Sequence, residues 1–389
     1  MKIKPEHHFK TREVHAGVRP DPVTGAILTP IYQATTYVQE SVDDYLAKGY
    51  SYSRSGNPTV AALEERITAL EGGAGTACFS TGMAATSAIM MALLNNGDHV
   101  VLSDVVYGGT HRLSTRVLSR FGVEFSFVDT ADPRNVRDAV RDNTRLIFTE
   151  TPANPTLKLT DIAAVSDIAR EHEIPHCVDN TFLTPYFQRP LELGADLSMH
   201  STTKYMDGHN VTVGGSVTAA TMELLEQIQF VRNCLGSNMS PMVAFFTLQG
   251  CKTLSTRLEA QSAGAMKVAH FLESHPMAEQ VVYPGLESFP QRELAQRQAS
   301  GFGAMLWFEV KGGVASGKKL MNALELWSLA ENLGSVESLV THSVTMTHAD
   351  MDPADRQRVG ISDGLVRLSV GLEDPDDLIA DLRQALDGL

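Results

Sequence analysis

A lysine among hydroxyl side chains occurs in the stretch Asp196–Tyr205, DLSMHSTTKY. The first half reads as a short apolar strand that ends at His200, and Lys204 follows it closely. A lysine held in a pocket can have a lowered pKa and form a Schiff base with a carbonyl compound, while neighbouring hydroxyls can bind a phosphate. An ordinary surface lysine explains the stretch about equally well.

Outward from this stretch, apolar strand-like runs alternate with helical runs. The predicted strands are His99–Ser103, Glu124–Val128, Arg145–Thr149, His176–Val178 and Asp196–His200. The predicted helices include Val60–Glu71, Met83–Leu94, His111–Arg120, Pro133–Val140 and Asp161–His172, the last with Thr160–Asp161 as its cap. This alternation is typical of a mostly parallel sheet covered by helices, so the predicted fold class is α/β.

Three regions differ in pattern along the chain. Residues 1–60 are rich in Pro, Gly, Tyr and Thr without clear periodicity, which predicts an extended arm. Residues 61–250 carry the alternating pattern of a large α/β domain, and residues 251–389 predict a smaller α+β domain. In this last region we expect helices Thr253–Ser274, Pro290–Gln298 and Pro375–Leu386 and strands Gly303–Val310 and Val366–Val370.

The composition excludes several classes of protein. With 43% hydrophobic and 20% charged residues, the chain has an ordinary soluble balance rather than a disordered or fibrous one. Lys plus Arg is 32 and Asp plus Glu is 46, which gives a net charge of −14. A nucleic acid or an anionic membrane surface is therefore an unexpected main partner. The uncharged segment between Glu71 and Asp98 contains too many small polar residues for a membrane span and predicts a buried loop followed by a buried helix.

The cysteines and histidines suggest no metal or disulfide framework. The cysteines, which lie far apart without a C-x-x-C motif, are Cys78, Cys177, Cys234 and Cys251. We expect reduced thiols in a cytoplasmic protein, and the polar segment Met1–Lys10 shows no signal peptide. The histidines are scattered, and His200, His209 and His348 are expected either to support site residues from behind or to be structural.

Two further features could belong to the same site as Lys204. Gly82 and Met83 open a predicted helix after Ser80-Thr81, and the amides at a helix N-terminus suit a phosphate, although many tight turns look the same. Asp179 follows an apolar strand, at the end where open α/β sheets bind ligands. A helix-capping role for Asp179 is an equal alternative.

Taken together, these residues match the requirements of pyridoxal phosphate. Its aldehyde needs an amine, its phosphate needs a helix N-terminus and hydroxyls, and its pyridine nitrogen needs a carboxylate. The carboxylate keeps the nitrogen protonated, so that the ring can accept electrons from a substrate carbanion. Tyr107, just after a predicted strand, is a candidate to stack on the ring.

The longer run Asp196–Asn210 resembles the pyridoxal phosphate attachment signature of the Cys/Met metabolism (transsulfuration) enzymes. The resemblance extends from about residue 12 to the C-terminus. Supporting stretches are Tyr52–Pro58, Ser80–Met83, Glu150–Pro155 and Val366–Gly371.

The resemblance implies the fold type I, aminotransferase-like architecture and a homotetramer built from two tight dimers. It also implies roles for individual residues. Lys204 would be the Schiff-base lysine, Asp179 the partner of the pyridinium nitrogen, and Tyr107 the stacking ring. The phosphate would be held by Gly82, Met83, Ser201 and Thr203 and, from the neighbouring subunit, by Tyr52 and Arg54. Arg367, with Asn154 nearby, would bind the substrate α-carboxylate.

Within the family, the residues favour γ-elimination on cystathionine, with Lys204 and Tyr107 as proton carriers. Methionine γ-lyases carry a cysteine two residues after the stacking tyrosine, where this chain has Gly109. Arg112 and Glu337, with Ser338, resemble the distal pocket of cystathionine γ-lyases and γ-synthases.

Two departures leave room for another γ-substituted amino acid. Ser51 replaces a usual acidic residue, and Asn332 replaces a usual serine. Cystathionine γ-synthase is the second reading, and methionine γ-lyase and the sulfhydrylases are the third. A pyridoxal phosphate-binding protein without turnover is a fourth, of another class.

Overall fold

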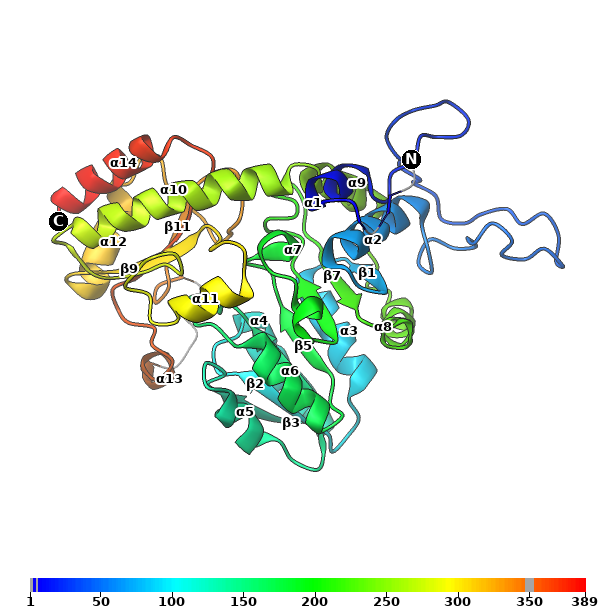
Figure 1. Cartoon of the computed structure of the whole chain (residues 1–389), viewed down its shortest axis with the longest axis horizontal. Helices are drawn as coiled ribbons and strands as arrows, with labels where there is room; N and C mark the ends of the chain where they lie inside the picture. Colours follow the sequence, from blue (N-terminus) through cyan, green and yellow to red (C-terminus); the bar gives the residue numbers. More distant parts are fainter. Residues whose placement is uncertain (1–2, 5, 347–352) are drawn as a thin grey trace.

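A computed structural model describes residues 3, 4, 6–346 and 353–389. A seven-stranded sheet lies at the centre of the larger part (Figure 1). Its strands, in spatial order, are β1 (Gly75–Phe79), β7 (Gly215–Ala219), β6 (Leu197–His200), β5 (His176–Asp179), β4 (Thr144–Glu150), β2 (His99–Ser103) and β3 (Glu124–Val128). Only β7 runs antiparallel to its neighbours, β1 and β6. The mostly parallel sheet predicted from the sequence is confirmed.

Helices cover both faces of this sheet, which makes three layers. Helices α3 (Gly82–Leu93) and α8 (Met222–Leu235) pack on one face, and α5 (Pro133–Ala139) and α6 (Ile162–Glu171) pack on the other. Helices α2 (Pro58–Glu71) and α9 (Pro241–Cys251) form a further apolar cluster beside β1. Strand β2 is buried along its whole length, as expected for a strand covered on both sides.

Side-chain caps set where two of these helices begin. The hydroxyl of Thr81 accepts a hydrogen bond from the amide of Ala84 at the start of α3. The carboxylate of Asp161 accepts one from Ala164 at the start of α6, so the predicted cap is confirmed.

Two predictions in this part of the chain are wrong. The buried loop expected after Glu71 contains β1, which pairs in register with β7 from Gly75 opposite Ala219 to Phe79 opposite Gly215. The single helix expected over His111–Arg120 is instead α4 (Gly108–Arg112), a π-helical turn (Leu113–Val117) and a 3-10 turn (Leu118–Phe121). Hydroxyls of Ser114, Thr115 and Ser119 bond the carbonyl oxygens four residues earlier, where they compete with regular helical bonds.

A second, five-stranded sheet forms the core of the C-terminal part. Its spatial order is β10 (Ser328–Leu329), β11 (Leu339–His342), β12 (Leu365–Ser369), β9 (Met305–Val310) and β8 (Ala278–Val282). Apolar residues of α10 (Leu254–Ser274), α12 (Gly313–Ala323) and α14 (Pro375–Asp387) pack with this sheet in one cluster. The remaining helices are α7 (Thr184–Phe187), a 3-10 turn (Pro190–Leu193), α11 (Arg292–Gln298) and α13 (Pro353–Arg358). The division into domains at residue 250 stays a prediction.

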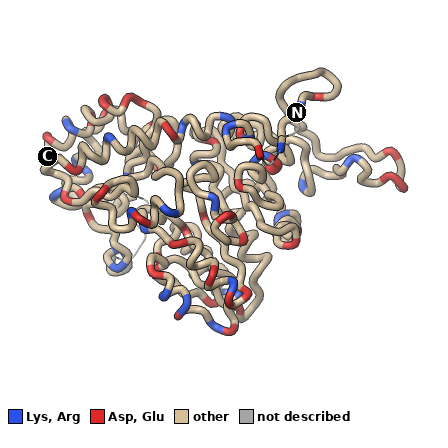
Figure 2. The backbone as a smooth tube through the Cα atoms, viewed as in Figure 1, with Lys and Arg blue, Asp and Glu red and all other residues tan. Residues whose placement is uncertain are grey.

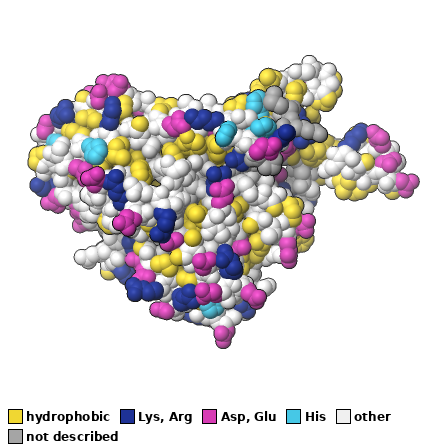
Figure 3. Space-filling model, in the orientation of Figure 1, with side chains coloured by type: hydrophobic (Ala, Val, Ile, Leu, Met, Phe, Trp, Pro, Cys, Tyr) yellow, Lys and Arg dark blue, Asp and Glu magenta, His cyan; other side chains and the backbone are white. Residues whose placement is uncertain are grey.

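The N-terminal region projects from the body as two loops after α1 (Phe9–His15) (Figure 1). Its longer loop is closed by an isolated bridge between Thr36 and Tyr52. Hydrophobic side chains lie on its surface (Figure 3), and Val38 and Val42 are more than nine-tenths exposed, at 91% and 92%. The charged residues are spread along the chain with both signs interspersed (Figure 2). Within the described residues, every helix is too short or too polar to cross a membrane.

Candidate functional site

A cavity of about 320 Å³ opens at the carboxyl ends of β4, β5 and β6. This is the edge at which open α/β sheets bind ligands. The second sheet closes the cavity from the other side through Arg367 on β12. The predicted site residues that line the cavity are Gly82, Met83, Tyr107, Arg112, Asn154, Asp179, Ser201, Thr203, Lys204 and Arg367.

Lys204 follows β6 and reaches into the cavity. Its amino group donates a hydrogen bond to the side-chain oxygen of Asn332. Burial, together with the positive charge of Arg367, lowers the pKa of Lys204 to about 8. The amino group therefore exists partly as the neutral, nucleophilic amine near physiological pH.

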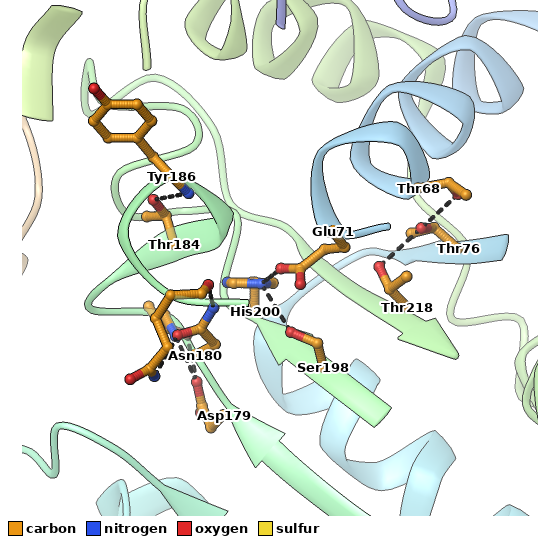
Figure 4. Close-up of polar contacts among 12 residues, drawn as sticks. Thr68, Glu71, Thr76, Asp179, Asn180, Thr184, Tyr186, Ser198, His200 and Thr218 are labelled. Carbon is orange, nitrogen blue, oxygen red and sulfur yellow. Dashed lines mark hydrogen bonds and ion pairs between the residues drawn. The ribbon is translucent and has the colours of Figure 1, made fainter. Parts of the chain in front are cut away.

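Asp179 ends β5 and lines the same cavity (Figure 4). Its Oδ1 accepts hydrogen bonds from the amide of Thr181 at 3.1 Å and from the Thr181 hydroxyl at 2.6 Å. Burial raises the pKa of Asp179, while these bonds and the nearby His200 lower it. A buried carboxylate that faces a cavity favours a cationic group beside it.

His200, at the end of β6, and Glu71, at the end of α2, form a buried pair (Figure 4). His200 Nε2 contacts Glu71 on α2, and Ser198 lies 3.3 Å from the same nitrogen. Neither residue lines the cavity. His209 bonds its neighbour Asp207, and His348 lies outside the described residues.

The N-terminus of α3 supplies backbone donors at one end of the cavity. Thr81 caps Ala84, and helix geometry leaves the amides of Gly82 and Met83 without partners within the helix. Ser201 lies close by, since a Cβ added at Gly82 would stand 3.2 Å from its hydroxyl oxygen. The Thr203 hydroxyl is bonded to both backbone groups of Gly214, at 3.0 and 3.2 Å.

Tyr107 presents its ring at the cavity wall and is half exposed. Its neighbour Gly109 is tightly enclosed. A Cβ at this position would lie 2.6 Å from the Tyr107 ring and 2.7 Å from the sulfur of Met83. A side chain at residue 109 would therefore require Tyr107 or Met83 to move.

Arg367 is a buried cation that no carboxylate of the described residues neutralises by a salt bridge. Its Nη1 donates to Asn154 Oδ1 at 2.9 Å, and its Nη2 donates to the backbone oxygen of Asn332 at 3.0 Å. Its Nε has no hydrogen-bond partner among the described residues. Burial lowers its pKa to about 10. These features fit a site for an anionic group such as a carboxylate.

Of the predicted distal residues, Arg112 lines the cavity, whereas Glu337 and Ser338 do not. Glu337 is exposed and accepts a hydrogen bond from Asn210 at 2.8 Å, and Asn332 donates to Asn210 at 2.6 Å. Ser338 is fully buried, with its hydroxyl bonded to Glu373 and to the amide of Gly371. The geometry therefore gives no support to a substrate contact by the Ser338 side chain.

Tyr52 and Arg54 lie on the projecting arm and do not line the cavity. The Arg54 guanidinium stands 5.2 Å from the centre of the Tyr52 ring, and its Nε donates to Asn233 at 3.2 Å. Within one chain, these two residues contribute nothing to the cavity.

Glu150 and Thr181 are among the cavity residues that the sequence did not predict as site residues. Glu150 ends β4 as Asp179 ends β5, so its position after an apolar run carried the same signal. Thr181 accepts a hydrogen bond from the amide of Ser201 at 2.9 Å and so joins the ends of β5 and β6.

The cavity fits pyridoxal phosphate in its donor set. It holds one lysine, a buried carboxylate, an aromatic face and free helix amides, while Arg367 remains available for a second anion. Among the described residues, no group of three His, Cys, Asp or Glu side chains is placed to hold a metal ion.

Comparisons with known proteins identify the same chemistry. The family described as Cys/Met metabolism PLP-dependent enzyme matches residues 10–387. A cystathionine γ-lyase of Bacillus subtilis is 47% identical over 98% of this chain and 99% of its own length. A cystathionine β-lyase of Coxiella burnetii is also 47% identical, over 97% of this chain and 98% of its own.

A solved structure is similar throughout. It is that of cystathionine γ-lyase from Lactobacillus plantarum complexed with L-serine, with a TM-score of 0.95 and 40% identity over 98% of this chain and 99% of that chain. The seven-stranded sheet and the smaller C-terminal sheet thus belong to the fold type I architecture expected from the sequence.

Proposed function

This chain belongs to the Cys/Met metabolism family of pyridoxal phosphate-dependent enzymes, and from that premise we propose that it cleaves L-cystathionine by γ-elimination. The products are cysteine, 2-oxobutyrate and ammonia. The observation that carries this choice of member is the surroundings of Tyr107. A side chain at Gly109 would require Tyr107 or Met83 to move, while Arg112 brings a cation to the same wall.

Bound pyridoxal phosphate supplies an aldehyde for amines and a ring that takes up the electron pair from the substrate Cα. Different residues of the cavity would hold the ring and the phosphate of the cofactor. Asp179 would pair with the ring nitrogen, and Tyr107 would stack on the ring. The amides of Gly82 and Met83 and the hydroxyls of Ser201 and Thr203 would hold the phosphate.

Lys204 would hold the aldehyde of the cofactor, and we propose that it carries protons. With a pKa of about 8, its amino group can accept a proton from Cα and return one without a large energetic cost at neutral pH. Tyr107 is the second proton carrier, because its ring lies on the same cavity wall. Arg367 and Asn154 orient the substrate through its α-carboxylate.

Arg112 and Glu337 are proposed to meet the distal amino-acid end of cystathionine. Arg112 lines the cavity, and Glu337 is connected to the cavity residue Asn332 through hydrogen bonds to Asn210. A cation and an anion at this end suit the charged carboxylate and ammonium of the second half of the substrate.

Three other reactions remain alternatives. Cystathionine γ-synthase, which joins an activated homoserine to cysteine, uses the same cofactor-binding residues. Methionine γ-lyase is disfavoured by Gly109. The equal identity to a γ-lyase and a β-lyase means that overall similarity does not choose between the two bonds.

We further propose a homotetramer whose sites are shared between subunits. Tyr52 and Arg54 would reach the phosphate of a neighbouring subunit, which accounts for their distance from the cavity in their own chain. The exposed valines of the arm would be covered in such an assembly. A cytoplasmic location is proposed from the four unpaired cysteines.

Product analysis of the cofactor-loaded enzyme with L-cystathionine alone tests the proposed reaction. Cysteine with 2-oxobutyrate is the expected outcome. Homocysteine with pyruvate would show that the enzyme breaks the other carbon–sulfur bond. Intact cystathionine, together with synthesis of cystathionine from O-succinylhomoserine and cysteine, would move the assignment to the synthase.

A further inference from the structure

Glu150 is a buried carboxylate in the cavity wall with two backbone partners. Its Oε2 accepts the amide of Tyr107 at 2.7 Å, and its Oε1 accepts the amide of Asn154 at 2.9 Å. The side chain is only 6% exposed, so water does not replace these bonds.

The two partners come from different segments, and both line the cavity. Tyr107 follows β2 and presents its ring to the cavity, while Asn154 follows β4 and accepts a hydrogen bond from Arg367. A single carboxylate thus connects the aromatic wall to the anion-binding Asn154 and Arg367.

The surroundings of Glu150 oppose its ionisation. Glu150 and Asp179 are register neighbours on β4 and β5. Burial, and then the charge of Asp179, raise the pKa of Glu150 to about 8, while the two amide bonds act in the opposite direction. The Tyr107 and Asn154 amides are therefore what favours the ionised form at this position.

We propose that Glu150 is a positioning residue that fixes the ring of Tyr107 relative to Asn154 and Arg367. It acts through these residues and not on the reacting atoms. The roles of Tyr107 and Arg367 in this inference rest on the proposed function, but the position of the tyrosine ring can be measured without substrate.

Glu150→Gln is the test variant, because it keeps the shape of the side chain and removes one acceptor. Its amide NH₂ faces one of the two backbone N–H groups, so one contact is lost. Glu150→Asp is the second variant; it keeps the charge and both oxygens on a shorter stem. The matched control is Asp381→Asn on α14, where a buried carboxylate accepts the amides of Glu325, Leu326 and Trp327, none of which lines the cavity.

Four quantities are compared in the pyridoxal phosphate-loaded proteins: the visible circular dichroism of the cofactor, the KM and the kcat for L-cystathionine, and the melting temperature. We expect Glu150→Gln to change the dichroism and to raise KM by roughly 10- to 100-fold, the range for leaving a buried backbone N–H without its acceptor. Glu150→Asp should show the same changes to a smaller extent. Asp381→Asn should lower the melting temperature without changing the dichroism or KM.

Wild-type dichroism and KM in a folded Glu150→Gln protein would overturn the inference. Equal changes in Glu150→Gln and Asp381→Asn would overturn it as well, because they would show a general structural effect. If Glu150→Gln does not fold, the Glu150→Asp comparison decides in the same way. A wild-type enzyme that leaves cystathionine intact contradicts the proposed function, and the dichroism comparison still decides the role of Glu150.

Discussion

At the scale of single residues, the buried positive charge of Arg367 acts on Lys204. Burial and this charge lower the pKa of Lys204 to about 8. Only the neutral amine attacks an aldehyde, so the rate at which cofactor-free enzyme combines with pyridoxal phosphate should rise with pH through about 8 and level off above it. Stopped-flow absorbance measures this rate.

Arg367→Gln tests the cause of the shift. Removing the positive charge raises the pKa of Lys204, so the midpoint of the rate profile should move to higher pH. Arg383→Gln, at an arginine that stacks on Phe271, is the control and should leave the midpoint in place. An unchanged midpoint in Arg367→Gln would refute the electrostatic explanation.

A cysteine at position 109 should disturb the tyrosine wall. Its Cβ would lie 2.6 Å from the Tyr107 ring, so we expect Gly109→Cys to weaken pyridoxal phosphate binding by roughly 5- to 150-fold, which corresponds to the 1–3 kcal/mol typical of overpacking. Gly108→Ala is the matched control, since its Cβ would approach only the flexible end of Arg112, at 3.3 Å. A titration of cofactor-free protein that finds equal affinities would contradict this account of Gly109.

At this scale, sequence position predicted part of the site. Asp179 and Lys204 follow apolar runs, and the structure brings both to one sheet edge. Glu150 carried the same signal and was missed, because a glutamate after a strand looks like any solvated residue. Arg367 donates hydrogen bonds to Asn154 and Asn332, which are far from it in the sequence. Only the fold therefore reveals that this arginine is buried and that its described hydrogen-bond acceptors are not carboxylates.

At the scale of elements, the start of α3 depends on a close approach to β7. A Cβ at Gly215 would lie 2.4 Å from the backbone oxygen of Thr81 and 2.8 Å from the Cα of Gly82. Backbone atoms cannot yield as a flexible side chain can. Gly215→Ala should therefore lower the free energy of unfolding by roughly 1–3 kcal/mol and weaken binding of pyridoxal phosphate by displacing the helix N-terminus.

Urea unfolding and a cofactor titration check both parts of this prediction. Gly264→Ala in α10 is the control, because its Cβ would meet neighbours at an ordinary 3.4 Å and alanine favours the helix. A Gly215→Ala protein with unchanged cofactor affinity would show that α3 does not hold the phosphate.

Strands and helices with a strong local hydrophobic pattern could be predicted from the sequence. Elements that depend on pairing with a distant strand or on side-chain hydroxyl groups could not. Strands β2 and β3 occur at the predicted residues, because their apolar runs are bounded by polar residues. Strand β1 lies in a segment rich in small polar residues, and its pairing with β7 cannot be read locally. The departure from a regular helix after α4 comes from hydroxyl groups, which no apolar pattern records.

At the scale of the whole molecule, the question is whether each site needs Tyr52 and Arg54 from the N-terminal arm of a second chain. If Tyr52 and Arg54 serve a neighbouring subunit, Lys204→Ala and Arg54→Ala chains should complement each other. Each variant alone should be nearly inactive. Reassembly of an equal mixture should restore about one quarter of wild-type activity, since about half of the dimers are mixed and each has one intact site.

Activity assays after mixed refolding measure this recovery, with each variant refolded alone as control. No recovery from the mixture would contradict shared sites. The sequence predicted an irregular arm from its lack of periodicity, but a single chain cannot show what its exposed valines contact.

The central claim is that Lys204 is the residue in this cavity that forms a Schiff base with the aldehyde of pyridoxal phosphate. The most direct measurement is to load the protein with pyridoxal phosphate, reduce it with borohydride and map the modified peptide by mass spectrometry. Lys204 is the only lysine among the described residues that line the cavity, so the label should be found on Lys204 and be absent from this cavity in Lys204→Ala. A stoichiometric label on any other lysine, with Lys204 unmodified, would contradict the account.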